Sequence, residues 1–436
     1  MLRSIFVVVL LAIGSVFALQ GPLYAAGLYL WIAYFRPEYW AWSDVFKTLD
    51  LSYYAGAYLV LRTIFSSTKF TLNRRSVLLF AFLAYGLLST ALSPHAAYAF
   101  HYWQAFAKTV IVSYLLTILI TTPSELRLIL LVITLSLGIE GAKQGWSDLI
   151  ISPGAQNMNL VPFLGDNNVV AIGMLMLLPI VAALGRTADT LWKRRAFQLL
   201  TIGMLYRALS TYSRGGFVAC AAVAVMYWWR SPYKMRTALA GLLAVAIVVP
   251  ALPSQFWSRM STIATAAGQR DRSQLGRFHF WNVALSMAND RPAVGVGFNA
   301  YEAAYDGYDA SNGEYSTARS VHSVWFGVLA EMGYPGLFLY LLIVAQGFNA
   351  CRRVRRRAAR GEICKELGRY ATGFEAALVA FVVGGSFVPF QYNEMLWHFF
   401  ALTIALESVT VAAPVVERRA APLEATPACT FAWGPG

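Results

Sequence analysis

Charged residues are scarce in this chain of 436 residues: 13% are Asp, Glu, Lys or Arg, and 58% are hydrophobic. A soluble globular protein carries about 25% charged residues. The shortage excludes an ordinary soluble protein and indicates an integral membrane protein. Few polar stretches are long enough to build a separate core, so we predict one membrane domain over residues 1–413.

Cysteines are also few. The four lie in one apolar run, one basic loop and the tail, with neither paired nor metal-ligand spacing: Cys220, Cys351, Cys364 and Cys429. We therefore expect no disulfide, no metal site and no cofactor.

The chain does have many apolar runs long enough to cross about 30 Å of hydrocarbon, roughly 17 to 25 residues each. Two shorter runs come before residue 36, and a retained hairpin is favoured over a cleaved signal peptide. The pattern predicts an all-α polytopic integral membrane protein with twelve or thirteen transmembrane helices. The further spans are expected near residues 51–67, 76–94, 104–121, 126–144, 167–185, 197–213, 215–230, 236–253, 323–349, 371–389 and 395–413.

Basic residues cluster in short loops, so the net charge of +13 reports orientation rather than nucleic-acid binding. The strongest cluster, in loop 350–370, is expected on the cytoplasmic side near anionic lipid headgroups. By parity the same side holds Lys69 with Arg74 and Arg75, Lys193 to Arg195, and Arg230 with Lys234 and Arg236.

The same parity predicts a long periplasmic loop over residues 254–321. This parity also places the N-terminus and Arg36 on the outer side, which the positive-inside rule disfavours. One of the first two runs is therefore a candidate re-entrant segment. Residues 414–436 contain four prolines and are predicted to be a disordered cytoplasmic tail.

A single histidine, His322, enters an apolar run directly after the longest polar loop. Its ordinary pKa of about 6.5 lets it accept and return a proton near neutral pH. Residues 324–332 are apolar except for Glu331, which should place His322 at the water-facing mouth of a span. The alternative is a histidine that merely caps a helix at the headgroup level.

Arg214 stands at a tight turn on the outer face, beside Gly215 and Gly216. Glycines let a ligand approach the backbone, and a guanidinium suits phosphate, so the turn predicts an anion site. The alternative is an interfacial arginine whose head reaches toward water. Arg207, deeper in the preceding run, is a candidate to extend this anion site inward, but pairing with a carboxylate such as Glu140 is favoured.

Arg277 begins a second outer segment. Apolar residues recur there at helical spacing and predict an amphipathic helix on the outer interface: Phe278, Trp281, Leu285 and Ala288. Arg272, Arg277 and Arg291 place positive charge against the positive-inside rule, which favours a functional role.

Weaker candidates on the outer side are Asp166, Asn167, Asn168, Lys108 and Lys143. The first three precede a span and are suited to polar donor groups, or to ordinary helix capping. The two lysines lie in or near apolar runs and are candidate phosphate contacts, unless a carboxylate or carbonyl satisfies them.

Two further outer segments have open roles. Gly295-Val296-Gly297 has no strand before it, so it predicts a turn rather than a nucleotide loop. The loop from Tyr301 to Tyr315 is rich in tyrosine and acidic residues, and suits either stacking on sugar rings or a solvated lid.

The spacing around His322 resembles a known signature. His322-Ser323, then nine residues, Gly333, two residues and Gly336 look like the signature of the O-antigen ligase and O-antigen polymerase family. Members of this family are polytopic membrane glycosyltransferases that move a glycan from a polyprenyl diphosphate to an acceptor.

Other segments extend the resemblance over most of residues 100–345. The Ser213-Arg214-Gly215 turn is similar to the family's first arginine motif, with Val218 in place of its leucine. The segment 276–297 resembles the second arginine region. Residues 165–168 and 255–263 look like a subgroup of probable O-glycosylation ligases found with exosortase A systems.

This resemblance implies a GT-C-like membrane fold with a cavity open to the outer leaflet. It implies metal-independent, inverting transfer from an undecaprenyl-diphosphate-linked glycan to a lipid or protein acceptor, at the periplasmic face of the bacterial inner membrane. Arg214 and Arg277 would hold the diphosphate, and His322 would be the general base. Arg272, Trp281 and Ser323 would be secondary site residues.

Residue chemistry agrees with these roles, because two fixed guanidinium groups stabilise the charge that grows on a diphosphate leaving group. Two alternatives stay open. A polymerase runs the same chemistry with a different acceptor, whereas a transporter also has many spans with embedded charges. The candidate groups gather on one face and the sequence shows no repeat, which favours an enzyme.

Overall fold

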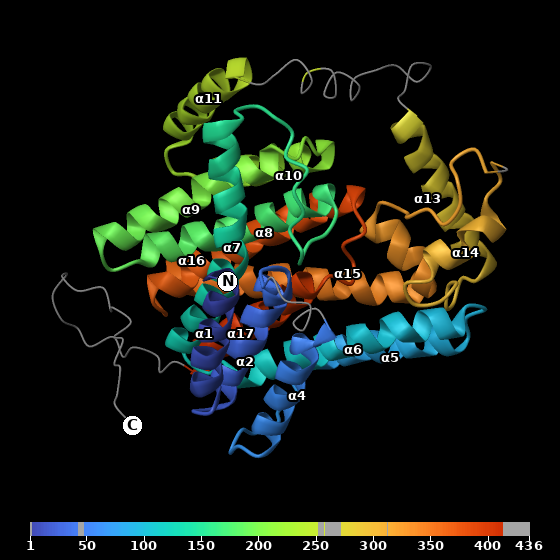
Figure 1. Cartoon of the computed structure of the whole chain (residues 1–436), viewed down its shortest axis with the longest axis horizontal. Coiled ribbons are helices and arrows are strands. Elements are labelled where there is room, and N and C mark those ends of the chain that lie inside the picture. The colour runs from blue at the N-terminus through green and yellow to red at the C-terminus, as the bar shows by residue number, and fades with distance from the viewer. Residues whose placement is uncertain (1, 42–47, 252–256, 258–271, 312, 413–436) are drawn as a thin grey trace.

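The computed structural model describes residues 2–41, 48–251, 257, 272–311 and 313–412, and within them the chain is helical, with no strand. Figure 1 shows the helices, which run in the order α1 (Leu2–Ala18), α2 (Pro22–Phe35), η1 (Pro37–Tyr39), α4 (Leu51–Ile64), α5 (Arg74–Ala91), α6 (Ala96–Leu119), α7 (Pro123–Ile151), α8 (Asn167–Thr187), α9 (Leu191–Leu209), α10 (Arg214–Arg230), α11 (Lys234–Ala251), α13 (Arg272–Asp290), α14 (Tyr301–Tyr308), α15 (Val324–Ala359), α16 (Lys365–Gly384), η3 (Gly385–Phe387) and α17 (Glu394–Ala412). The prediction of an all-α polytopic membrane protein is confirmed.

Five helices in the described part of the chain are long and apolar enough to span a membrane, by length and composition alone. They are Ala96–Leu119, Asn167–Thr187, Val324–Ala359, Lys365–Phe387 and Glu394–Val411. The other predicted spans also coincide with helices, but these do not meet the criterion. The total of twelve or thirteen spans therefore stays a prediction.

Polar residues at the predicted boundaries cap the helices. Thr122 and Glu125 form a reciprocal capping box at the start of α7, with Pro123 in the first turn. Asn73 accepts hydrogen bonds from the backbone of the first turn of α5, and Asp166 does so for α8. These caps satisfy backbone groups that would otherwise be unpaired where the chain enters the apolar region.

Helix α15 is interrupted at Gly333, whose φ of 66° lies in the left-handed region. Because of this break, the loop before α14 docks against the helix: Val296 N donates to Ala330 O at 2.9 Å, and Tyr334 N donates to Pro292 O at 2.9 Å. The segment containing Gly295 is therefore a turn, as predicted.

Ion pairs gather the basic loops at one end of the bundle, which we call the basic end. Arg75 of α5 and Arg353 of α15 both pair with Glu407 of α17. Two further arginines, Arg230 of α10 and Arg355 of α15, pair with Glu375 of α16. The predicted grouping of these loops on one face is confirmed. The opposite end, where α10 and α15 begin, we call the site end.

The first two helices form a hairpin with its turn toward the basic end, where Arg62 of α4 donates to Leu19 O at 3.2 Å. Both are continuous helices. The re-entrant segment considered for this region stays a prediction. The start of α1 lies near Trp40, because Arg3 is 5.9 Å from the Trp40 ring centroid.

Two apolar cores hold the described residues together. The larger one joins most of the long helices and includes Phe82, Tyr340 and Trp397. A smaller one forms a lobe in which α13 and α14 pack on the beginning of α15, around Phe280 and Tyr305. Figure 1 shows α13 and α14 together at the site end.

The cysteines differ from the prediction, and two predicted segments are not fully described. Cys364 is disulfide-bonded, so the expectation of no disulfide is wrong there, whereas Cys220 and Cys351 are free. The predicted tail 414–436 and most of the segment 255–263 lie outside the described residues.

Candidate functional site

The turn that leads into α10 is fixed by its own backbone and cap. Tyr212 has a left-handed φ of 57°, and the Ser213 side chain accepts a hydrogen bond from Gly216 N at 3.2 Å. Arg214 is therefore the first residue of α10, where it is half-buried. The helix dipole and the guanidinium both favour an anion at this position.

The two glycines after Arg214 serve packing. A Cβ on Gly215 would lie 2.8 Å from Cβ of Phe387, and a Cβ on Gly216 would lie 2.9 Å from Cβ of Ala171. Close approach of a ligand to the backbone at these glycines stays a prediction. They let α10 approach η3 and α8 closely.

The loop of residues 152–166 is tied to the turn before Arg214 by hydrogen bonds. Asn157 N donates to Ser210 O at 2.8 Å, and two side-chain amides donate to Thr211 O: Gln156 at 3.1 Å and Asn167 at 3.3 Å. The start of α8 is thereby held beside the start of α10.

Arg207 anchors the same loop from within α9. Its fully buried guanidinium donates to Gln144 Oε1 and to Asn159 O, each at 2.7 Å. Glu140 instead accepts from Gln144 at 2.8 Å and pairs with Lys143 at 2.7 Å. The expected direct pairing of Arg207 with Glu140 is therefore wrong, because Gln144 stands between the two groups.

Helix α13 is confirmed. Phe280, Ala284 and Met287 are buried in the lobe core, Ala288 of the predicted apolar stripe is also buried, and Phe278 of that stripe is 47% exposed. Arg277 lies toward η3, with its guanidinium carbon 6.0 Å from the Phe387 ring centroid.

Arg277 lies close enough to Arg214 for their charges to repel. Burial lowers the pKa of Arg277, Arg214 lowers it further, and Asp166 opposes the shift. Phe387 contacts both segments, since it packs on Gly215 and lies under Arg277. An anion bound beside these two arginines and the N-terminus of α10 would interact favourably with both positive charges and offset their repulsion.

His322 lies in the loop that enters α15, half-buried and with a left-handed φ of 48°. Such a conformation is costly for a residue with a side chain and is often found at functional sites. The ring lies 6.2 Å from that of Phe280 on α13. Burial lowers the pKa of His322 below its ordinary value, and Arg277 lowers it further. The lowered pKa favours the neutral imidazole, which is the form that accepts a proton.

Three candidates around these residues lie at or beside the starts of helices α8 and α15. Asp166 caps α8 by accepting from Asn168 N at 2.8 Å, and its charge also reaches His322 and Arg277. Ser323 is buried and is the N-cap residue of α15. Asn168 contributes to the α8 cap only through its backbone N–H, which donates to Asp166.

Two buried polar atoms near the site could form a hydrogen bond with a ligand. Trp281 stacks on Phe326 with ring centroids 5.1 Å apart, and its buried Nε1 has no hydrogen-bond partner among the described residues. The buried Oδ1 of Asn167 also has none within the described ranges. Both belong to elements that carry the site, α13 and α8.

The remaining candidates do not join this group. Lys108 lies 5.3 Å from the Tyr53 ring centroid on α4, and Lys143 is paired with Glu140 and lies 4.3 Å from the Trp40 ring centroid. The geometry gives no support to either as a phosphate contact. Arg272 begins α13, but its side chain is not among those that the structure describes.

The tyrosine-rich segment belongs mostly to the lobe core. Tyr301 and Tyr305 are buried on α14, and Tyr315 stacks on His279 at 4.9 Å. His279 in turn pairs with Asp309 at 2.8 Å. The stacking platform for sugars considered for this segment is therefore wrong for Tyr301 and Tyr305, whose rings are buried.

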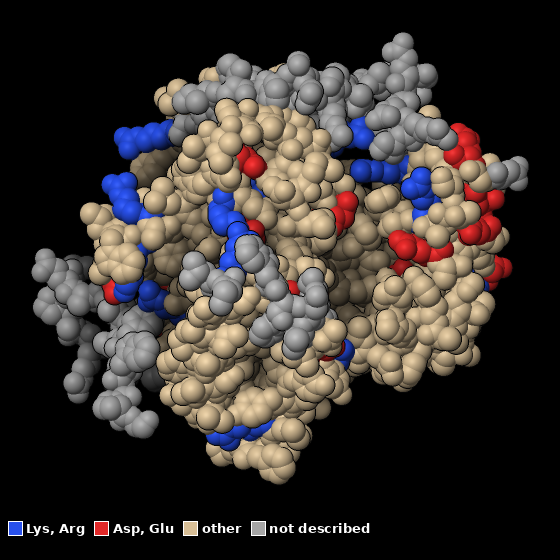
Figure 2. Space-filling view, viewed as in Figure 1, with Lys and Arg blue, Asp and Glu red and all other residues tan. Residues whose placement is uncertain are grey.

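Sequence reasoning missed Arg319. Its charge reaches His322 and contributes to the lowered pKa of that ring. The signal was its position three residues before His322 in a polar loop of the site end. Figure 2 shows the surface hollowed between the α13–α14 lobe and the body of the bundle, with acidic residues on the outer side of the lobe.

The segment that carries Arg214, Arg277 and His322 is similar to a known family. Residues 199–341 match the family model described as O-antigen ligase. Residues 2–183, which include Asp166 and Asn167, match a family of unknown function, DUF5935. No curated protein matches the chain. The O-antigen ligase match covers the turn before α10, the α13–α14 lobe and the start of α15.

Proposed function

We propose that this protein is a membrane glycosyltransferase of the O-antigen ligase type. It transfers a glycan from an undecaprenyl-diphosphate carrier to a hydroxyl group of a lipid or protein acceptor. The observation that carries the proposal is the convergence of Arg214, Arg277 and His322, from three separate elements, within a segment similar to O-antigen ligases.

The two arginines hold the diphosphate of the donor. As the glycosidic bond breaks, negative charge grows on the departing diphosphate, and fixed guanidinium groups stabilise it. The mutual repulsion of Arg214 and Arg277 supports this role, because a bound anion would offset the unfavourable interaction between the two guanidinium groups.

His322 acts as the general base. The acceptor oxygen forms a bond to the anomeric carbon while the bond from that carbon to the diphosphate oxygen breaks. The electron pair of that bond leaves with the diphosphate, and the hydroxyl proton moves to the imidazole. Attack from the face opposite the diphosphate inverts the anomeric configuration. The lowered pKa of His322 supports this assignment.

We place this site at the periplasmic face of the bacterial inner membrane. The ion pairs at the basic end support the assignment, since basic loops stay in the cytoplasm and the site lies at the opposite end of α10 and α15. Within the family, the likeness to exosortase-associated ligases is part of the same proposal and rests on residues 165–168 and 255–263.

The direct test incubates the purified protein with lipid-linked glycan and candidate acceptors and identifies by mass spectrometry which molecule gains the glycan. We expect a lipid or protein acceptor to gain mass, His322→Ala to abolish the gain, and His101→Ala to retain it as a matched control on an exposed histidine. A second lipid-linked glycan as the acceptor would instead identify a polymerase. Solute uptake by the protein in vesicles, without transfer, would identify a transporter.

A further inference from the structure

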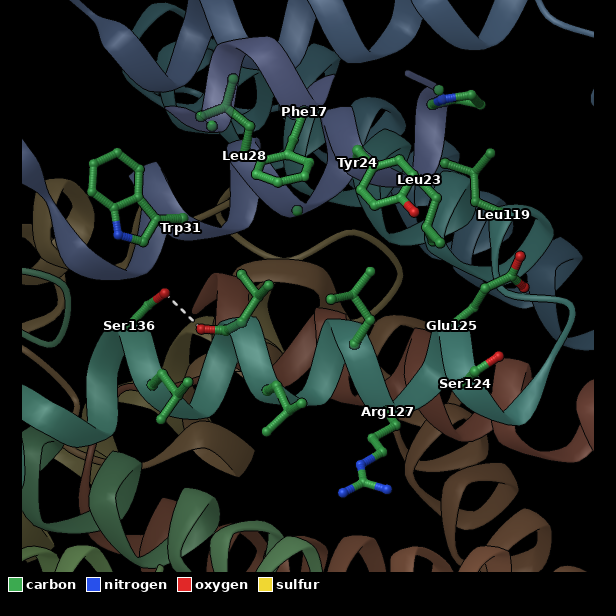
Figure 3. A pocket seen from close by; sticks show the side chains of 18 of the residues that line it. Phe17, Leu23, Tyr24, Leu28, Trp31, Leu119, Ser124, Glu125, Arg127 and Ser136 are labelled. Carbon is green, nitrogen blue, oxygen red and sulfur yellow. Dashed lines mark hydrogen bonds between the residues drawn. The ribbon is translucent and has the colours of Figure 1, made fainter. Parts of the chain in front are cut away.

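A large cavity lies between the α1–α2 hairpin and α7, and none of Arg214, Arg277 and His322 lines it. Its volume is about 2400 Å³. Pockets for small molecules usually measure about 300–1,000 Å³, so this one is larger than a soluble metabolite requires. Figure 3 shows Phe17, Leu28 and Trp31 of the hairpin facing α7 across it.

The long walls of the cavity are apolar. Phe17, Leu28 and Trp31 line one side, and Leu131 and Leu135 of α7 line the other. A space with such walls inside a membrane-spanning bundle suits hydrocarbon chains, because it offers water too few hydrogen-bonding partners. The occupant therefore has a long apolar part.

The polar residues of the cavity concentrate at the basic end. Five cations line it there: Lys69, Arg127, Lys193, Lys365 and Arg369. The three carboxylates at this end already have partners. Glu125 accepts from the Thr121 and Thr122 backbone N–H groups at 2.7 and 2.8 Å, Asp189 pairs with Lys193 at 2.9 Å, and Glu366 lies 3.9 Å from Arg127.

Two of these cations remain available to a ligand. Lys69 and Lys365 are exposed, and neither forms an ion pair within the described part of the chain. They come from the loop before α5 and from the start of α16, so they approach the cavity from different elements. Basic pockets between membrane helices at the cytoplasmic side bind anionic headgroups.

We infer that the cavity binds an anionic phospholipid from the leaflet at the basic end. The headgroup phosphate lies between Lys69 and Lys365, and the acyl chains extend between the hairpin and α7. The lipid is distinct from the glycan donor, which the proposed function places at the site end.

Native mass spectrometry of the full-length protein, released from nanodiscs of equimolar phosphatidylglycerol and phosphatidylcholine, tests this inference. We expect phosphatidylglycerol to be retained in preference to phosphatidylcholine. A lysine near an anionic lipid contributes about a fivefold factor in affinity, so Lys69→Gln with Lys365→Gln should lower the retained ratio about 25-fold.

The matched control is Arg352→Gln with Arg356→Gln, which removes two exposed charges from α15 at the same end but outside the cavity. It should keep the wild-type ratio. Leu135→Trp narrows the apolar part and should lower retention of both lipids. Equal retention of the two lipids by the wild-type protein, or an equal loss of preference in the control, overturns the inference, whatever the result of the glycan-transfer assay.

Discussion

At the scale of single residues, the site brings two like charges close together. Arg277 is near Arg214 and lowers the pKa of His322, while Asp166 supplies a nearby negative charge. This arrangement favours an anionic ligand near the two guanidinium groups, because a negative charge there interacts favourably with both.

The lowered pKa of His322 predicts the pH dependence of glycan transfer. A base must be neutral to act, so the rate should be constant around pH 7 and should fall only as the pH drops through a value below 6.5. Arg319→Gln removes one charge that lowers this pKa, so the acidic limb of the profile should move to higher pH with little change at pH 8.

Transfer rates measured from pH 5 to 8 check this prediction, with Arg195→Gln, an exposed residue of α9, as the control. An acidic limb above pH 6.5 in the wild-type protein, or an identical limb in Arg319→Gln, would show that His322 does not set the profile.

At the scale of elements, the break in α15 connects the loop before α14 to the helix that follows His322. Gly333 allows this contact, because a Cβ there would lie 2.4 Å from Pro292 O, at a left-handed φ of 66°. The glycine in the His322 signature therefore has a structural explanation: it fixes the docking of the lobe on α15.

Gly333→Ala should lower the free energy of unfolding by about 1–3 kcal/mol and loosen the lobe, since it adds steric conflict to backbone strain. Gly361→Ala is the matched control, because it has a φ of 72° but open space around the position of a Cβ. Thermal unfolding of the two variants in the same detergent compares them. Equal destabilisation would mean that strain alone accounts for the effect.

The elements were largely predictable and their contacts were not. Apolar length and polar caps are local, so the helices and the turn at Gly295 followed from the sequence. The packing of Gly215 against Phe387 and the bridging of Arg207 by Gln144 involve residues far apart in the chain. The same applies to Tyr301 and Tyr305, whose burial depends on how α13 rotates against α14.

At the scale of the whole molecule, the two ends of the bundle differ in chemistry. Ion pairs gather the basic loops at one end, and the candidate site lies at the other. We predict that the site end faces the periplasm. Asn289→Cys, exposed at the end of α13, should react with a membrane-impermeant maleimide in intact spheroplasts, whereas Arg352→Cys should react only after permeabilisation. The reverse pattern would contradict the orientation.

The most direct measurement is the affinity of the purified protein for undecaprenyl diphosphate, compared between the wild type, Arg214→Gln, Arg277→Gln and the double variant. We predict that each single variant binds at least about tenfold more weakly and that the two losses are not additive, because both guanidinium groups hold one diphosphate. Arg195→Gln should bind like the wild type. Undiminished binding by the double variant would contradict a shared anion site formed by Arg214 and Arg277.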